Sequence, residues 1–137
     1  MFYHLLFVYG TLMRGFSAHA FLLDSDFVSY GVLYGARLLH LEDGYPGAVE
    51  GEGEIYGEVY RVDSITLKAL DLFEEFYEER PEDSFYVRKR KFVRLIPYND
   101  FVEVWVYLLN PVRLEALSFT EVPFGNWKEF LKKLLKM

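Results

Sequence analysis

The sequence predicts a single α+β domain whose sheet is strongly curved or closed into a small barrel. Its 137 residues suffice for one domain with one hydrophobic core. Hydrophobic residues make up 52% of the chain and aromatic residues 19%, which is typical of a folded, strand-rich domain. Strand-like stretches alternate with glycine-rich segments such as "EDGYPGAVEGEG" at 42–53, and glycine at this density favours a curved sheet.

The first half of the chain is predicted to form mainly strands. Continuous apolar residues from Leu5 to Tyr9 predict a strand that is buried on both faces and central in the sheet. A short helix is expected over Ser17–Asp24, with Ser17 as its N-cap. Further strands are predicted over 27–34, 37–41 and 54–62.

The second half begins with the clearest helix of the sequence. Apolar residues change from a period of two to a period of 3.6 after Asp63, which predicts a helix over Ile65–Tyr77 with Asp63 or Ser64 as N-cap. The strands 85–96 and 101–109 follow and are joined by the turn-forming residues "PYND", which predicts a hairpin.

Two later patterns add a core face and a last helix. The alternating residues at 102, 104, 106 and 108 are all aliphatic, so this face of the second hairpin strand should lie in the core. The range 126–136 has apolar residues at helical spacing and Asn126 as a candidate N-cap. This C-terminal helix is expected to pack over the sheet of the single domain 1–137.

Composition excludes several classes of function. The net charge of −6 would repel phosphate backbones, so no nucleic-acid partner is expected. The absence of cysteine rules out disulfides, thiolate metal ligands and cysteine nucleophiles. No apolar run reaches the roughly 18 residues that a membrane span needs, and the apolar start lacks the basic region of a signal peptide. We expect a cytoplasmic protein with no membrane partner, and the sequence does not indicate its oligomeric state.

The segment "FVYGTLMRG" at 7–15 is either a simple turn or a site. Gly10 and Gly15 have the spacing of a phosphate-binding loop after a strand. Phe16 and Ser17 stand where such a loop needs Lys and then Ser or Thr, so the phosphate interpretation fails. A loop after a central strand still offers free backbone N–H groups, and such a nest can hold a carboxylate. Both the turn and the anion nest therefore remain open.

Glu74 is the candidate general base of the predicted helix. On a helical wheel it falls beside Leu67 and Leu70, whereas its neighbour Glu75 falls on the polar arc. A carboxylate on the core side must be paired, hydrogen-bonded or raised in pKa, and a raised pKa suits a proton-transfer residue. The alternative is a structural ion pair between Glu74 and an arginine of the next strand, at position 88, 90 or 94.

Other chemistries find little support in the sequence. His4, His19 and His40 lie far apart without metal-ligand spacing, so we expect structural roles for them and no metal site. No GxSxG segment is present to support a serine nucleophile.

An ordered set of motifs resembles the γ-glutamylcyclotransferase-like family, and most closely its γ-glutamylamine cyclotransferase branch. The motifs are "FVYGTLMRG", "GYPG", "GEVYRVD", "LDLFE", "FYVR" and "VWVY", and the resemblance runs from about Leu5 to Leu109. It leaves the helix at 126–136 outside the family core. The resemblance implies a small mixed β-barrel flanked by short helices, with a cavity at its mouth and no cofactor.

The resemblance also implies a reaction and its residues. In this family the α-amine of a γ-glutamyl compound attacks its own side-chain amide, which releases 5-oxoproline and a free amine. The family's catalytic glutamate matches Glu74. Substrate-binding positions of the family match a further set of residues, namely Tyr9, Gly10, Thr11, Leu12, Tyr86 and Tyr107, with Arg88 two positions after Tyr86.

Two departures from the family pattern bear on the substrate. Many relatives have glycine directly after the catalytic glutamate, where this chain has Glu75, and the following loop "FYEERPEDS" is long and acidic. We therefore expect a cyclotransferase for a γ-glutamylamine or a small γ-glutamyl peptide. The rival hypothesis is a non-catalytic domain that binds a small carboxylate on the same barrel, and a third is a structural interaction module, which would need an exposed apolar patch.

Overall fold

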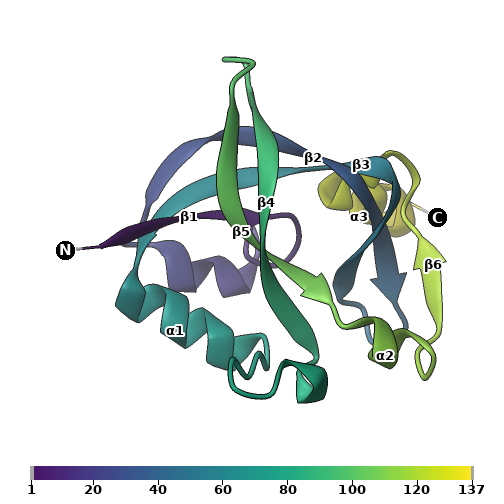
Figure 1. The fold of residues 1–137 in the computed structure, drawn as a ribbon. Helices are drawn as coiled ribbons and strands as arrows, with labels where there is room; N and C mark the ends of the chain where they lie inside the picture. Colours follow the sequence, from purple (N-terminus) through teal and green to yellow (C-terminus); the bar gives the residue numbers. More distant parts are fainter. Residues whose placement is uncertain (1, 137) are drawn as a thin grey trace.

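The computed structural model describes residues 2–136, which form a strand-rich domain with short helices at its sides (Figure 1). The strands are β1 (Tyr3–Val8), β2 (Asp26–Leu41), β3 (Pro46–Asp63), β4 (Tyr86–Ile96), β5 (Phe101–Leu109) and β6 (Phe119–Glu121). The helices are α1 (Ser64–Phe73), α2 (Pro111–Leu114) and α3 (Trp127–Leu135), with short 3-10 helices η1 (Ser17–Leu22), η2 (Pro81–Asp83) and η3 (Pro123–Gly125). Within residues 2–136, no helix has the length and apolar character needed to cross a bilayer.

Five of the strands close into a mixed barrel. They are hydrogen-bonded in the order β3-β1-β5-β4-β2, and β2 pairs with β3 to complete the ring. The pairing of β1 with β5 is parallel, with Leu6 opposite Trp105, whereas the other neighbours are antiparallel. β6 adds to the far end of β2. The predicted fold class, a small mixed β-barrel with short helices, is confirmed.

The two longest strands differ from the sequence prediction because glycine bends them without ending them. The predicted strands 27–34 and 37–41 form one strand, β2, with a register shift at Gly35, where φ is 75°. Residues 46–53, expected as turns, belong to β3, so that Gly47 pairs with Leu39. The chain reverses only between these strands, where Gly44 has a φ of 92°. Bulged, glycine-containing strands give the curvature that a small barrel requires.

The helix after β3 is shorter than predicted. Asp63 caps it by accepting a hydrogen bond from the Thr66 N–H at 2.7 Å, as expected. It ends at Phe73 rather than Tyr77, because Glu75 adopts a left-handed φ of 55°. The N–H of Glu75 donates to Leu72 O, and the N–H of Phe76 donates to Asp71 O. These two bonds form a Schellman motif, which stops the helix directly after Glu74.

The helices predicted over 17–24 and 126–136 are both present in part, but only one has the predicted N-cap. The helix expected over 17–24 is the 3-10 helix η1, and the Ser17 side chain makes no capping bond, so that N-cap prediction was wrong. Asn126 caps α3 as predicted, by accepting from the Glu129 N–H. Only the start of α3 is buried, through Trp127, whereas Leu134 and Leu135 are exposed. The helix therefore touches the barrel at its N-terminal end rather than lying over the sheet.

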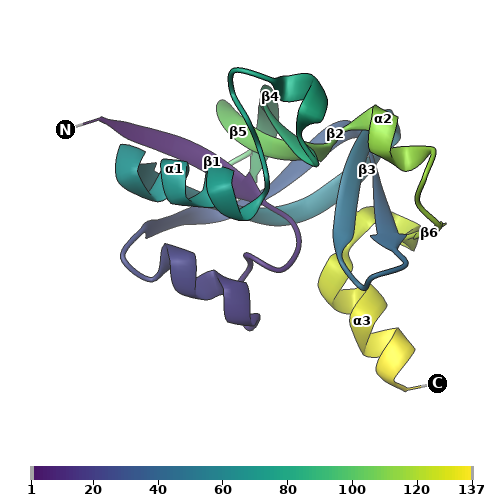
Figure 2. The ribbon, with the colours of Figure 1, turned by 90° about the horizontal axis from the view of Figure 1, so that it is seen from below.

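The core fills the barrel and one of its flanks. The predicted core face of β5 is confirmed, since Val104, Val106 and Leu108 are buried. Apolar residues of β1 complete the interior, with Leu6, Phe7 and Val8 each almost fully buried. Both views of the ribbon place α1 and α3 on opposite sides of the barrel (Figures 1 and 2). α1 alone lies beside the end of β1, where the candidate site is found.

Candidate active site

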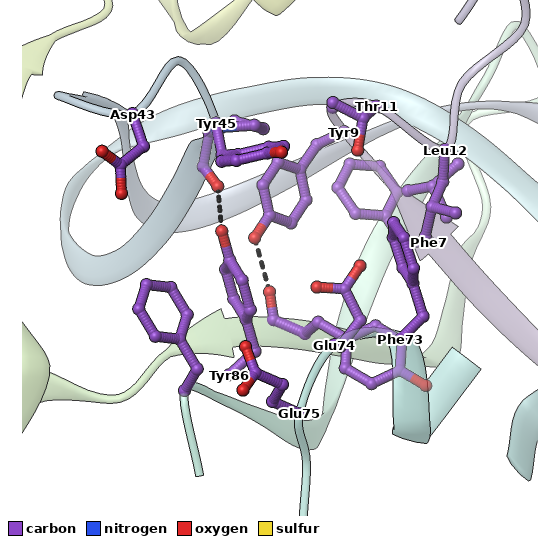
Figure 3. Close-up of a pocket in the computed structure, with 15 residues that line it drawn as sticks. Phe7, Tyr9, Thr11, Leu12, Asp43, Tyr45, Phe73, Glu74, Glu75 and Tyr86 are labelled. Atoms are coloured by element: carbon purple, nitrogen blue, oxygen red, sulfur yellow. Dashed lines mark hydrogen bonds between the residues drawn. The ribbon is translucent and has the colours of Figure 1, made fainter. Parts of the chain in front are cut away.

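A cavity of about 320 Å³ opens where β1, α1, β4 and β5 come together. This volume lies in the range of small-molecule binding sites. Figure 3 shows Glu74 near the centre of the cavity, below Thr11 of the loop after β1 and Tyr45 of the turn before β3. Its lining comprises Phe7, Val8, Tyr9, Gly10, Thr11, Leu12, Asp43, Tyr45, Pro46, Phe73, Glu74, Glu75, Phe85, Tyr86 and Tyr107.

The loop after β1 is a tight turn that forms one wall of the cavity. The N–H of Met13 donates to Gly10 O at 3.0 Å and closes the turn. A Cβ atom at Gly10 would overlap the ring of Pro46, so only glycine lets the loop pass this close to β3. His19 on η1 holds the loop from outside, because its Nδ1 donates to Leu12 O at 2.9 Å.

The same loop leaves backbone donors unused. Among the residues that the structure describes, no backbone or side-chain acceptor is hydrogen-bonded to the N–H groups of Gly10, Thr11 or Leu12. All three residues line the cavity. Consecutive free N–H groups on a turn are a favourable environment for an anion. The turn and the anion nest are therefore compatible, and the segment has the features of both.

Glu74 lies at the end of α1 with its carboxyl group in the cavity. Its N–H donates to Leu70 O at 2.8 Å, so its backbone is fixed by the helix. Within residues 2–136 its carboxyl group has no hydrogen-bond or ion-pair partner. Burial of the carboxylate raises the pKa of Glu74 to about 7. A carboxyl group with this pKa can both accept and release a proton near neutral pH.

The arginines considered as partners of Glu74 are engaged elsewhere. Arg88 donates from Nε and Nη2 to the two oxygens of Asp71, at 2.8 and 3.1 Å. Arg90 pairs with Glu103. Arg94 donates to the Tyr34 hydroxyl and to the Asn99 side chain. The ion-pair alternative for Glu74 is thus not what the structure contains.

Three tyrosines surround the carboxyl group of Glu74. The hydroxyl of Tyr86 donates to Pro46 O, and that of Tyr9 donates to Tyr107 O (dashed lines in Figure 3). The Tyr107 hydroxyl donates to Asp71 Oδ1 at 2.7 Å. Burial, above all, raises the pKa of all three phenols, so they are neutral at physiological pH. Each phenol has one proton, and each proton is already shared with a protein acceptor.

Arg88 does not line the cavity and lies in the layer behind it. Its guanidinium stacks on the Trp105 ring at 4.2 Å and makes the two-fold contact with Asp71. Asp71 in turn accepts the bond from Tyr107, so Arg88 reaches the cavity only through two intermediates. Asp71 was not among the residues singled out from the sequence, so this network was missed. The spacing of Asp71 and Glu74 on one helix, beside Tyr86 and Arg88 on one strand face, was the available signal.

A second buried carboxylate fixes the far end of the glycine loop. Glu58 on β3 is 2% exposed and accepts from the Arg14 N–H at 3.1 Å and from the Tyr60 hydroxyl at 2.8 Å. Its other oxygen lies 3.3 Å from Nζ of Lys128 on α3. Sequence analysis did not identify Glu58 or Lys128, whose side chains come together over 70 residues of chain.

The histidines are spread over the molecule. His4 contacts the Ser64 hydroxyl at 3.0 Å, His19 bonds to the loop, and His40 stacks against Trp127. Within residues 2–136, no group of three or more acidic, histidine or cysteine side chains has the arrangement of a metal site.

Comparison with known proteins shows where this barrel and cavity occur. A family model described as γ-glutamyl cyclotransferase, AIG2-like, matches residues 6–129. The γ-glutamylcyclotransferase family protein ytfP of Citrobacter rodentium is 34% identical over 128 residues, covering 89% of this chain and 93% of the relative. The γ-L-glutamyl-butirosin B γ-glutamyl cyclotransferase of Niallia circulans is 28% identical over 125 residues, covering 91% of this chain and 76% of the relative.

A solved structure agrees with these sequence matches. The crystal structure of an AIG2-like protein from Mus musculus superposes with a TM-score of 0.69 at 29% identity, and covers 93% of this chain and 95% of the mouse chain. Because the family model spans nearly the whole chain and the barrel is the same, this protein belongs to the γ-glutamyl cyclotransferase, AIG2-like family.

Proposed function

We propose that the protein is a cofactor-free γ-glutamyl cyclotransferase that converts a γ-glutamylamine or a small γ-glutamyl peptide to 5-oxoproline and a free amine. One observation carries the proposal: the unpaired carboxyl group of Glu74, with a pKa of about 7, shares a cavity with the free N–H groups of the glycine loop. The family to which the chain belongs, and the reaction named for its Niallia circulans relative, support the same activity.

Glu74 would transfer protons between the two nitrogen atoms of the substrate. An α-amine with a pKa near 8 is largely protonated at neutral pH and must lose a proton before it attacks. Over the whole reaction the attacking nitrogen loses two protons as its bond to the γ-carbonyl carbon forms. The amide nitrogen gains two protons as its bond to the same carbon breaks. A single carboxyl group titrating near pH 7 can relay both, because it returns to its starting state after each transfer.

The glycine loop would hold the α-carboxylate of the substrate. Three N–H groups without protein acceptors, at Gly10, Thr11 and Leu12, match the acceptors of a carboxylate. Anchoring this end restricts the chain of the substrate to conformations in which its amine can reach its own amide. Because nucleophile and electrophile share one molecule, this restriction is a proximity effect and needs no covalent enzyme intermediate.

The oxyanion of the tetrahedral intermediate also needs a donor. Tyr9, Tyr86 and Tyr107 already donate their hydroxyl protons to protein acceptors. The favoured donor is therefore the one loop N–H that the two oxygens of the α-carboxylate leave unused, since it has no bond to break before the oxyanion forms.

The test measures 5-oxoproline by mass spectrometry after incubation with γ-glutamyl-ε-lysine, γ-glutamyl-alanine and a wider γ-glutamyl panel. We expect product from at least one compound, and a loss of about 10²-fold or more in kcat for Glu74→Gln, the usual effect of removing a general base. Glu78→Gln is the matched control, because Glu78 is an exposed carboxylate outside the cavity.

Two results would contradict the proposal. Near-normal turnover by folded Glu74→Gln would exclude the assigned role of Glu74. Binding of a γ-glutamyl compound by calorimetry, without any 5-oxoproline across the panel, would establish the non-catalytic binding domain instead.

A further inference from the structure

We propose that the ion pair of Asp71 and Arg88 is a positioning unit for Glu74, which holds the hydroxyl of Tyr107 away from the Glu74 carboxyl group and leaves no net charge beside it. The inference rests on the proposed function, in which Glu74 transfers protons. Asp71 and Arg88 lie behind the cavity wall and do not line it. Both would therefore act through Tyr107 and through their charges.

Three phenol groups line the cavity beside Glu74, and each donates its proton to another acceptor. The hydroxyl of Tyr9 donates to Tyr107 O, and that of Tyr86 donates to a backbone carbonyl of β3, as the dashed lines of Figure 3 show. The Tyr107 hydroxyl donates to Asp71 Oδ1 at 2.7 Å. Since a phenol has one proton, each of these bonds removes a donor that Glu74 could otherwise have.

Asp71 differs from the other two acceptors because it is a charged side chain. The backbone carbonyls are fixed by the strands, whereas a carboxylate with little contact to water needs a partner for its charge. Arg88 is this partner, through two bonds of 2.8 and 3.1 Å to the two carboxylate oxygens. The guanidinium is fixed in turn on the ring of Trp105, 4.2 Å from its centroid. The side chains of Arg88 and Asp71 are only 9% and 14% exposed, so water screens their charges weakly.

The two charges of the pair act on Glu74 in opposite directions. Asp71 lies three residues before Glu74 along α1, so the two side chains are neighbours on the helix. The charge of Asp71 alone would disfavour a carboxylate at Glu74, and that of Arg88 alone would favour it. Together they cancel, and burial remains as the cause of the raised pKa of Glu74. The other titratable side chains that face the cavity are Tyr9 on β1, Asp43 and Tyr45 before β3, Glu75 after α1, Tyr86 on β4 and Tyr107 on β5.

The experiment follows the titration of the Glu74 carboxyl group by carbon NMR of protein labelled at glutamate Cδ, with the signal assigned by its loss in Glu74→Gln. Asp71→Asn keeps an oxygen for Tyr107 and leaves Arg88 unpaired, so the midpoint should fall by about one pH unit. Arg88→Met leaves the charge of Asp71 unpaired and should raise the midpoint by about one pH unit. The double variant Asp71→Asn/Arg88→Met removes both charges and should restore the wild-type midpoint.

A further comparison tests the role of the Tyr107 hydroxyl. Asp71→Ala/Arg88→Met also lacks both charges, but it offers the phenol no acceptor. The freed hydroxyl should donate to Glu74 and lower its midpoint by about one pH unit relative to Asp71→Asn/Arg88→Met, because a hydrogen bond to a carboxylate stabilises the charged form. Adding Tyr107→Phe removes the phenol proton and should reverse this decrease.

The pair of Arg90 and Glu103 is the matched control. Arg90 stacks on the same Trp105 ring at 4.3 Å and contacts Glu103, but both side chains are exposed. Arg90→Met and Glu103→Gln should leave the midpoint of Glu74 unchanged, since water screens their charges.

The direction of each change separates positioning from a purely structural role. Loss of structure exposes Glu74 and moves its midpoint down toward 4.5 in every variant, so only a positioning role gives a rise in Arg88→Met. A fall or no change in Arg88→Met, or equal midpoints in the Asn and Ala double variants, would overturn the inference. The titration needs no substrate, so a lack of 5-oxoproline would overturn the proposed function alone. With turnover, the acid limb of kcat/KM should move with the NMR midpoint, and a limb that stays in place would exclude Glu74 as the base.

Discussion

At the scale of single residues, burial of the Glu74 carboxyl group raises its pKa and also makes the stability of the fold depend on pH. Its native pKa of about 7 lies above its ordinary value of 4.5, so the native state binds the proton more tightly than the unfolded state. The stability that depends on this proton is fully present below pH 4.5. It is lost as the pH rises from there through 7. Glu74 therefore lowers the stability of the folded state at the pH values where its carboxyl group is ionised.

This argument predicts that Glu74→Gln has a higher free energy of unfolding than the wild type at pH 8. The difference should be on the order of 3 kcal/mol, which follows from the size of the pKa shift. Urea denaturation of both proteins at pH 5 and pH 8 measures it, and subtracting one protein from the other removes the titration of all other groups. If the two proteins show parallel pH dependence, Glu74 is not destabilised by burial.

Single residues also show where sequence reasoning reached its limit. The buried position of Glu74 could be predicted because its place among leucines follows from helical periodicity alone. The ion-pair partner of Arg88 could not be predicted, because the sequence does not show which of several nearby carboxylates an arginine will contact. Asp71 forms the ion pair with Arg88 and also accepts a hydrogen bond from the Tyr107 hydroxyl. Both contacts depend on how α1 packs against β4 and β5.

At the scale of elements, the end of α1 determines where both neighbouring glutamates point. Glu75 occupies the left-handed position of the Schellman motif, where glycine is strongly preferred. A glycine at this position, which the family resemblance implies for many relatives, would adopt this backbone conformation without strain. The helix was predicted to extend to Tyr77 because Glu75 is not a residue that usually ends a helix. Its backbone nevertheless has the left-handed conformation that a glycine would have at a helix end.

The left-handed backbone at Glu75 predicts that Glu75→Gly stabilises the protein. We expect a gain of about 1 kcal/mol in the free energy of unfolding, since glycine adopts this conformation without steric cost. Thermal or urea unfolding at neutral pH measures the change. Glu75→Gln is the matched control, because it removes the charge and keeps the strain. An equal gain in both variants would trace the effect to charge repulsion with Glu74 rather than to the backbone.

The strands β2 and β3 were predicted too short because their glycines were interpreted as turns. Glycine usually marks turns, and "EDGYPGAVEGEG" was therefore expected to separate strands. In a barrel, glycine inside long strands instead permits bulges, as at Gly35, and close contacts between strands, as at Gly57, where a Cβ atom would overlap Val8 O. A curved or closed sheet was predictable from glycine density, and the mixed barrel was implied by the family resemblance, whereas the strand boundaries depended on closure, which is a long-range property.

At the scale of the whole molecule, α3 is tied to the candidate site although it lies on the other side of the barrel. The carboxylate of Glu58 joins the Arg14 N–H at the end of the glycine loop to Lys128 on α3. The helix is thus coupled to the loop through one buried acidic group, and the family model indeed extends into α3, to residue 129.

Loss of this link should destabilise the protein and loosen the loop. We predict that Lys128→Met lowers the free energy of unfolding by about 2 kcal/mol, because Glu58 would remain buried without its cation. The double variant Glu58→Gln/Lys128→Met should recover most of this loss, since no unpaired charge then remains. Urea unfolding of the wild type, Lys128→Met, Glu58→Gln and the double variant gives the coupling free energy. Additive effects of the two single changes would show that the contact is of no energetic importance.

The parallel pairing of β1 with β5 has a consequence for the order in which the protein can form during synthesis. β1 is synthesised well before β5, so one of its edges finds its partner only when residues 101–109 have been made. The glycine loop follows β1 directly, and Tyr107 belongs to the late strand. Non-local closure of this kind is slow relative to the formation of local hairpins. The glycine loop and helix α1 with Glu74 can therefore be present in a nascent chain without a cavity between them, and the cavity is completed only when β1 and β5 meet.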